Sequence, residues 1–539
     1  MLIKKDATGN WPLFASLIIF GVVISVLFIL SIAKNQGHLV YALDDPYIHM
    51  SIAKNFVQHG VWGITQYGFT SSTSSLLWTL LISLSYYIFG VNEITPFILN
   101  IIFAVMTIFL IYCIFRKLKV SPIYTFLVLM AVIFFTPIPT LIFTGMEHTM
   151  QIFLIILFAY ISAQILSNDR EDLYKYLLLV AVLVTMARYE SLFLILTVSI
   201  LFLLKKKYIC SCLLLMVSLI PVGIYGIISM DNGWFFLPNS LVLKSFYLVN
   251  NGSQSSISTI FNFFHYFIGQ FMLNKSVSVL LLLSSLFFIF KLKNRKFWDL
   301  NSILLVIFIS TASLHMLFAK MGFFYRYESY LVALGIFVIS LELYKFLPEN
   351  GLFYNLDKIK ILRYLLSLFI MCLVVFTLTD RGYSSLTETS PATNNIYEQQ
   401  YQMSLFVNQF YSGDGVALND IGLVNYAASI NCLDLYGLGS LQVAKVKKDG
   451  YYDSAEISKL VDEDNIKVVI IYDSWFKGGI PSNWVKVGQW KIKNNVVCGD
   501  DMVSFYAVDP KDKDSLIKNL KTFSSQLPKD VKIKYIIKE

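Results

Sequence analysis

Long apolar stretches separated by short polar connections dominate the first 380 residues of the chain. Because about 20 apolar residues can cross a lipid bilayer as a helix, they predict a multi-pass α-helical membrane protein. The first stretch follows Lys4 and Lys5, is too long for a signal peptide and has no small-residue cleavage site, so we expect it to be retained. The predicted spans are 12–33, 76–91, 97–115, 121–143, 149–167, 173–187, 191–204, 208–229, 275–292, 298–318, 329–346 and 361–379.

Charged residues between these stretches predict which connections face the cytoplasm. Lysine and arginine are enriched on that side, so we assign four basic or charged connections to it: 168–172, 205–207, 291–296 and 345–363. The N-terminus is then inside, and everything after residue 380 is outside. The same alternation places the remaining connections outside: 145–148, 187–190, the long loop 230–274 and the region 323–328.

The number of spans must be odd if the two termini lie on opposite sides, yet twelve stretches are found. The basic run at 116–119 favours the inside, so either 76–91 or 97–115 would be re-entrant or interfacial. We therefore predict an odd number of spans, from 11 to 13.

The first external loop, 34–75, contains a short predicted helix. Asp45 followed by Pro46 is typical of an N-cap with proline at the first helical position. Apolar side chains then follow one side of residues 46–59, and Gly60 is expected to end the helix. This pattern predicts an amphipathic helix lying on the membrane surface.

The pattern changes after about residue 385 to short apolar strands interleaved with helices. We expect strands at 415–420, 431–437 and 466–475, a helix beginning at residue 421, and a hairpin region at 484–508. Such alternation predicts a mixed α/β domain. The chain is therefore divided into a transmembrane catalytic domain, 1–380, and an extracytoplasmic α/β domain, 381–539.

Composition supports a membrane protein, because 56% of the residues are hydrophobic and only 14% are charged, against about 25% charged in soluble proteins. The net charge of +8 does not indicate nucleic-acid binding, since the basic clusters flank apolar segments. The cysteines form no metal-binding motif. Cys432 and Cys498 could pair if the C-terminal part is exported.

Asp44 and Asp45 are the leading candidates for chemistry. Two adjacent acids just outside an apolar span are costly to desolvate, which suggests a function. The alternative is that Asp45 caps the helix and Asp44 is merely solvated. Because capping accounts for Asp45, Asp44 is left without a structural task and is the favoured general base.

Further charges lie at the predicted external ends of other spans: Glu147, Arg188, Glu190, Lys244 and Arg326. The planar guanidinium of arginine suits a phosphate. The alternatives are interfacial snorkelling and a buried ion pair of Arg188.

Several other polar residues have sufficient structural explanations. His49, His148 and His315 are expected to be structural, since no second histidine stands at ligand spacing. Asp420 is explained as an N-cap, and Gly437 and Gly439 as turn residues. The alternative for these three residues is an acceptor-binding edge.

Taken in order, these motifs resemble the GT-C superfamily of membrane glycosyltransferases, and within it the bacterial arabinofuranosyltransferase-like branch. The resemblance covers about residues 40–440. It is carried by DDPYIHMSIAKN with GVWG downstream, TGMEH, ARYES, LPNSLVLK, YRYE, NDIG and DLYGLG.

The resemblance implies an inverting transfer of a sugar, arabinofuranose in that branch, from a polyprenyl-phosphate donor to a cell-envelope glycan, lipid or protein. It places the enzyme in a bacterial inner or plasma membrane, with its active site outside. One acid of Asp44–Asp45 would deprotonate the acceptor. The donor phosphate would be bound by Arg188, Lys244 and Arg326. Substrate positioning would fall to Glu147, His148, Tyr189, Glu190, Asn239 and His49.

No cofactor is required by this resemblance, and a divalent cation, Mg or Mn, at the acidic pair is left open. Two adjacent carboxylates without further oxygen ligands make a weak metal site. The competing functions are a lipid or sugar transporter or flippase, and a membrane scaffold. Transporters usually contain internal repeats, and none is evident in the sequence.

Overall fold

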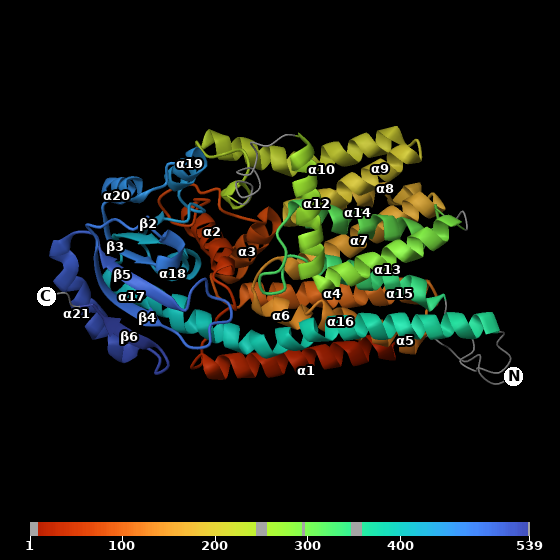
Figure 1. Cartoon of the computed structure of the whole chain (residues 1–539), viewed down its shortest axis with the longest axis horizontal. Helices are drawn as coiled ribbons and strands as arrows, with labels where there is room; N and C mark the ends of the chain where they lie inside the picture. Colours follow the sequence, from red (N-terminus) through yellow and green to blue (C-terminus); the bar gives the residue numbers. More distant parts are fainter. Residues whose placement is uncertain (1–8, 244–255, 294–296, 346–357, 537–539) are drawn as a thin grey trace.

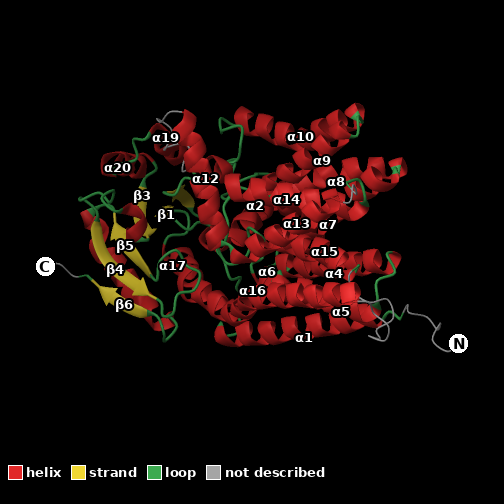
Figure 2. Cartoon of the chain, turned by 45° about the vertical axis from the view of Figure 1, so that its right-hand side comes forward, coloured by secondary structure: helices red, strands yellow, loops and turns green. Residues whose placement is uncertain are grey.

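The computed structural model describes residues 9–243, 256–293, 297–345 and 358–536. The chain forms a helical bundle, on the right in Figure 1, and a sheet domain beside one end of it. Figure 2 shows all the strands gathered in that second part. The predicted architecture, a helical membrane part followed by a mixed α/β domain, is thus confirmed.

Every predicted span contains a helix of the bundle. The stretch 121–143 is broken near Pro137, which separates α5 (Pro122–Phe135) from α6 (Ile138–Phe143). The helix α12 (Ser256–Leu273) was not predicted. The others are α1 (Trp11–Lys34), α3 (Leu76–Phe89), α4 (Thr95–Lys117), α7 (His148–Asn168), α8 (Tyr174–Ala187), α9 (Leu192–Leu204), α10 (Tyr208–Asp231), α13 (Lys275–Lys293), α14 (Leu300–Phe318), α15 (Ser329–Tyr344) and α16 (Lys358–Ile396).

Length and apolar composition identify seven helices of the described chain that can cross a membrane. They are α1, α4, α7, α10, α13, α14 and a segment at Leu365–Phe410. Four shorter apolar helices accompany them: Leu76–Phe89, Pro122–Phe135, Tyr189–Leu204 and Ser329–Tyr344. The total number of crossings stays a prediction.

Basic connections meet at the end of the bundle that lies away from the sheet domain. Lys207 pairs with Asp169 and Glu171, at 3.2 and 2.9 Å. Lys291 pairs with Asp299 and Glu342, at 2.7 and 3.0 Å. This grouping agrees with the expectation that these connections share one side of the membrane, although which side that is stays a prediction.

The helix α2 (Asp45–His59) corrects two expectations about the first external loop. It begins at Asp45 itself, and neither Asp44 nor Asp45 caps it through a side chain. Gly60 does end it, in a left-handed conformation with φ of 69°. Moreover, α2 is largely buried and packs between α3 and the sheet domain. It is not an amphipathic helix on the membrane surface, because Ile48 and Ile52 of its apolar side belong to the hydrophobic core of the C-terminal domain.

One long helix connects the two parts. The 39-residue α16 runs along the bundle and continues toward the sheet domain. It is followed by a π-helical turn, η3 (Tyr397–Tyr401), and by α17 (Gln402–Phe410). The predicted domain limit at residue 380 therefore falls inside a continuous helix.

The six-stranded sheet has the order β2-β1-β3-β5-β4-β6. β1 pairs in parallel with β2 and β3, and the other pairs are antiparallel. The antiparallel pair β4–β5 confirms the predicted hairpin region. The strands are β1 (Gly415–Leu418), β2 (Asn431–Asp434), β3 (Ile466–Ile471), β4 (Val485–Lys491), β5 (Met502–Ala507) and β6 (Lys532–Tyr535); the helices are α18 (Gly422–Ala427), α19 (Leu441–Asp449), α20 (Ser454–Glu463) and α21 (Lys513–Phe523).

Phe406, on α17, anchors one face of this sheet. Its ring is fully buried and lies 5.5 to 5.6 Å, between centroids, from those of Trp490, Phe505 and Phe523. Removing a ring from such a position leaves a cavity and also loses the transfer free energy of the ring.

We therefore expect Phe406→Ala to destabilise the sheet domain by about 3–5 kcal/mol. The loss would be measured as a lower thermal transition of tryptophan fluorescence in the full-length protein. Phe376→Ala is the matched control, because Phe376 is 83% exposed on α16. Equal transitions for the two variants would contradict this packing.

Candidate functional site

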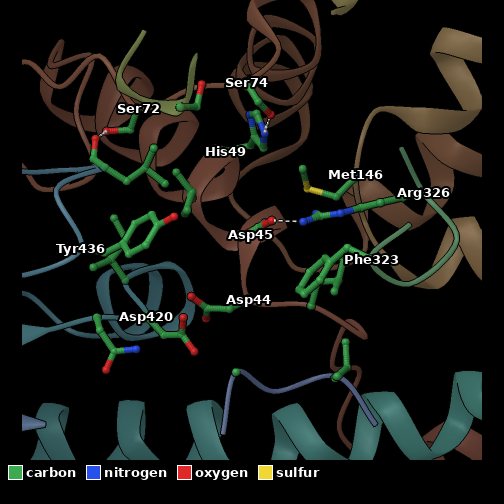
Figure 3. A pocket seen from close by; sticks show the side chains of 18 of the residues that line it. Asp44, Asp45, His49, Ser72, Ser74, Met146, Phe323, Arg326, Asp420 and Tyr436 are labelled. Carbon is green, nitrogen blue, oxygen red and sulfur yellow. Dashed lines mark hydrogen bonds and ion pairs between the residues drawn. The ribbon is translucent and has the colours of Figure 1, made fainter. Parts of the chain in front are cut away.

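A cavity of about 520 Å³ lies between the helical part and the sheet domain. Figure 3 shows its wall, with Asp44 and Asp45 near the centre. Of the predicted site residues, five line it: Asp44, Asp45, His49, Arg188 and Arg326. The sheet domain contributes Asn419, Asp420, Asp434, Tyr436 and Trp475 to the opposite wall, together with Gln400 from η3.

Asp44 is held by the backbone of the sheet domain. The amides of Gly422 and Leu423 donate hydrogen bonds to its two carboxylate oxygens, at 2.6 and 2.8 Å. Glycine is needed at 422, because a Cβ there would lie 2.1 Å from the backbone oxygen of Asp44. The expectation that Asp44 has no structural task is therefore wrong.

Asp45 forms an ion pair with Arg326, whose Nη2 lies 2.6 Å from the carboxylate. The Arg326 side chain is only 3% exposed, and its Nε and Nη1 have no hydrogen-bond partner among the described residues. Its guanidinium also lies 4.8 Å from the ring centroids of Phe323 and Tyr327. Buried guanidinium N–H groups without partners are prepared to bind an anion.

The turn that presents Arg326 is strained. Gly322 and the three residues after it, Phe323 to Tyr325, all have positive φ, between 49° and 79°. For residues other than glycine this is costly and persists only where the surroundings enforce it. Glu328 enforces it by accepting the Gly322 amide at 2.7 Å and by pairing with Arg381 of α16.

Arg188 belongs to a buried charge network. It pairs with Glu147 and with Glu190, each at 2.7 Å. His49 lies 3.8 Å from Glu147, and Ser74 donates to the same carboxylate at 3.3 Å. Although burial raises the pKa of Glu147, the Arg188 charge outweighs it and lowers that pKa to about 2. Glu147 is thus an anion that fixes Arg188 in the cavity wall.

The remaining predicted residues lie outside the cavity wall. His148 is buried behind it, against the ring of Tyr327. Asn239 links two segments, donating through Nδ2 to the Gly437 carbonyl at 2.9 Å and through its backbone to that of Ser71. Tyr189 and Glu190 are also absent from the lining. Lys244 lies outside the described residues.

The carboxyl ends of the three parallel strands supply residues that sequence reasoning missed as site residues. Asp420 does not cap α18; its carboxylate accepts from the Tyr472 hydroxyl at 2.7 Å and from Gln400 at 2.8 Å. The π-helical turn inserts Gln400 at this point. Since ligands of open α/β sheets bind at the carboxyl ends of their strands, these positions could have been found from the strand pattern.

The sheet-domain side of the cavity is acidic. Burial and the neighbouring Asp420 raise the pKa of Asp44 to about 8. Burial raises the pKa of Asp420 to about 6, despite the hydrogen bonds from Tyr472 and Gln400. The arginines lie across the cavity from these acids, as Arg326 does in Figure 3.

The donor set does not fit a metal ion at the acidic pair. Asp44 accepts two backbone amides and Asp45 faces Arg326, so the two carboxylates point apart. Within the described ranges there is no group of three or more His, Cys, Asp or Glu residues with metal-binding geometry. Cys432 and Cys498 are both free thiols, so the pairing considered from sequence is not formed.

Comparison with solved structures identifies the fold. ArnT from Cupriavidus metallidurans, bound to undecaprenyl phosphate, matches 92% of this chain and 98% of its own, with a TM-score of 0.50 and 11% identity. Its apo structure gives a TM-score of 0.48, 10% identity and the same coverage. The chain therefore shares the fold of ArnT.

Sequence comparisons add little to this assignment. A family described as a domain of unknown function (DUF8728) matches residues 394–506, which cover the sheet-domain wall of the cavity. No curated protein matches the sequence. With an ArnT-like fold and several long apolar helices, the chain is an integral membrane protein.

Loss of the Arg188 charge should destabilise the folded protein. Arg188→Met would leave Glu147, which is fully buried, without its counter-ion, at a cost of about 3–5 kcal/mol. We expect a lower melting temperature, partly restored by adding Glu147→Gln. Arg170→Met removes an exposed pair with Asp172 and should change nothing. A melting temperature unaffected by Arg188→Met would contradict the network.

The raised pKa values of Asp44 and Asp420 predict how stability depends on pH. The folded protein holds these protons more tightly than the unfolded chain, so their stabilising contribution is complete below about pH 4. It is lost as the pH rises through about 6 and then about 8. We expect the melting temperature to fall over this range, and less steeply in Asp420→Asn. If the melting temperatures of the wild type and of Asp420→Asn depended on pH identically, Asp44 and Asp420 would be excluded as the cause of this dependence.

Proposed function

We propose that the protein is an inverting membrane glycosyltransferase that moves a sugar from a polyprenyl-phosphate donor to an acceptor hydroxyl. This proposal rests on one cavity that has a fixed carboxylate, Asp44, on one side. On the other side lie guanidinium N–H groups of Arg326 that have no hydrogen-bond partner among the described residues. A base and an anion-binding group facing the same space suit the displacement of a phosphate by a hydroxyl.

Arg326 and Arg188 would hold the donor phosphate. The planar fork of arginine matches phosphate oxygens, and Arg326 keeps Nε and Nη1 available while Asp45 fixes its Nη2. Glu147 acts through Arg188 by fixing its position. Lys244 is proposed as an additional phosphate ligand on sequence grounds alone.

Asp44 would be the general base. Each of its oxygens accepts only one backbone amide, so a lone pair remains for the acceptor proton. Its raised pKa makes it a stronger base than an ordinary carboxylate. Asp45, by contrast, is engaged with Arg326.

The reaction requires one bond to form and one to break. The acceptor oxygen gives its proton to Asp44 and attacks the anomeric carbon from the face opposite the phosphate. The bond between that carbon and the phosphate oxygen breaks, and the polyprenyl phosphate leaves with the electron pair. The charge that develops on it is stabilised by the arginines.

The fold supports the donor class, because the ArnT structure that matches this chain holds undecaprenyl phosphate. Arabinofuranose as the sugar and an extracytoplasmic location of the cavity are proposed from the sequence resemblance and the charge distribution between spans. No step in this scheme requires a metal ion.

Replacing the base should abolish transfer while donor binding is retained. We expect Asp44→Asn to lower the transfer rate by about 10²–10⁴-fold, whereas thermal stabilisation by undecaprenyl phosphate persists. In Arg326→Met that stabilisation should be lost. Transfer would be followed with a radiolabelled polyprenyl-phosphate pentose in membranes.

Assays of transfer, of lipid movement and of cellular function separate the competing functions. Full transfer activity in both Asp44→Asn and Asp45→Asn would refute this mechanism. If the wild type moves lipid across the membrane but transfers no sugar, and the variants lose that movement, the protein is instead a flippase. Unchanged cellular function in both variants would indicate a scaffold.

A further inference from the structure

The sheet domain forms a second wall of the cavity that the proposed donor chemistry does not use. The parallel strands β1, β2 and β3 end there, and lining residues lie at or within four residues of their ends: Asn419 and Asp420, Asp434 and Tyr436, and Trp475. Figure 3 shows Tyr436 and Asp420 on the side of Asp44 away from Arg326. This wall is therefore placed where the attacking group must approach.

Two aromatic rings form the apolar part of this wall. Trp475 is 42% exposed although it follows a buried strand, and its ring centroid lies 5.5 Å from that of Tyr436. Gly499 also lines the cavity, and a Cβ there would lie 2.4 Å from the Trp475 ring. The glycine thus leaves room for the indole at the edge of the cavity.

Asn419 supplies an unsatisfied polar group to the same wall. Its Oδ1 accepts the Tyr472 amide at 2.9 Å, which fixes the orientation of the side chain. Its Nδ2 has no hydrogen-bond partner within the part of the chain that the structure describes, although the residue is only 6% exposed. Burying an amide N–H without a partner is costly, so a ligand oxygen is the expected partner.

Carboxyl groups line this wall: Asp420 and Asp434 belong to it, and Asp44 lies beside them. Because the pKa of Asp420 is raised only to about 6, its carboxylate is negative at neutral pH. The described cations that line the cavity, Arg188, Lys320 and Arg326, come from the helical part. Lys447 lies behind the Tyr436 ring, 4.9 Å from its centroid, and is not among the lining residues. A phosphate placed against this wall would meet like charges, which is an effective means of rejecting it.

We propose that the carboxyl ends of β1, β2 and β3 form the acceptor subsite, and that it takes a neutral sugar with free hydroxyl groups and excludes anionic acceptors. The proposal rests on the glycosyltransferase function above. The sugar ring packs against Trp475 and Tyr436, and one of its oxygens accepts from Asn419. Pockets of this kind combine aromatic side chains with a few orienting polar groups.

The test uses saturation-transfer NMR on the full-length protein in detergent, with excess undecaprenyl phosphate to occupy the arginines, and two probes, methyl arabinofuranoside and arabinose 5-phosphate. We expect saturation transfer to the neutral glycoside alone. Trp475→Ala and Asn419→Ala should each weaken its binding by about tenfold. Tyr451→Ala is the matched control, since Tyr451 is 74% exposed in the same domain and does not line the cavity. Asp420→Asn should allow the phosphate sugar to bind, a gain that misfolding cannot produce.

A second measurement keeps this proposal separate from the function on which it rests. Undecaprenyl phosphate should stabilise the wild type and Trp475→Ala equally. If it stabilises neither, the proposed function fails. If it stabilises both, two results would overturn the acceptor subsite. One is normal binding of the glycoside by Trp475→Ala, and the other is wild-type binding of arabinose 5-phosphate as tight as that of the glycoside. A glycoside that bound only at the donor end would lose its signal in Arg326→Met instead.

The neutral sugar could belong to a soluble glycan or to a lipid-linked one. Octyl arabinofuranoside, which inserts into the detergent micelle, distinguishes these sources from the methyl glycoside. Tighter binding of the octyl compound indicates a lipid-linked acceptor, and equal binding a soluble glycan. Either result supports the subsite provided that Trp475→Ala weakens both compounds.

Discussion

The contact on which the site depends joins two points 378 residues apart: the Asp44 carboxylate and the amides that open α18. It fixes the acid, holds α2 against the sheet domain, and closes one side of the cavity. Because Gly422 lies against the backbone of Asp44, no larger residue fits at this junction. A carboxylate buried in this way must be hydrogen-bonded or it becomes destabilising, so the ionised form of Asp44 and the domain interface depend on each other.

The cavity divides its chemistry between the two parts of the molecule. The helical part supplies cations, each fixed by an acid: Arg326 by Asp45 and Arg188 by Glu147. The sheet domain supplies acids, amides and aromatic rings at its strand ends. If the proposed function holds, this polarity would orient a substrate pair, with the anionic leaving group held at the cationic wall and the neutral nucleophile at the opposite one.

Hydrophobic patterning predicted the apolar helices and β1 to β5, but not α12 or β6, because burial in lipid or in a sheet core imposes a period or a length on an element. It could not predict that α2 is buried, since an apolar helix side that packs on a protein core has the same pattern as one that lies on a membrane. The group that binds the start of α18 was also predicted wrongly. Asp420 was expected to cap this helix, whereas Asp44 accepts its first amides. Partners so distant in sequence leave no local signal.

The continuity of α16 with the π-helical turn has a consequence for how the protein is made. The last apolar segment and the residue that bonds Asp420, Gln400, lie on one uninterrupted helical path, so the sheet domain can dock only after this segment has emerged. Asp44 is synthesised early, but its amide partners come more than 370 residues later. The nascent chain therefore carries an unoriented acid, and the cavity is completed only after Gly499 has been made.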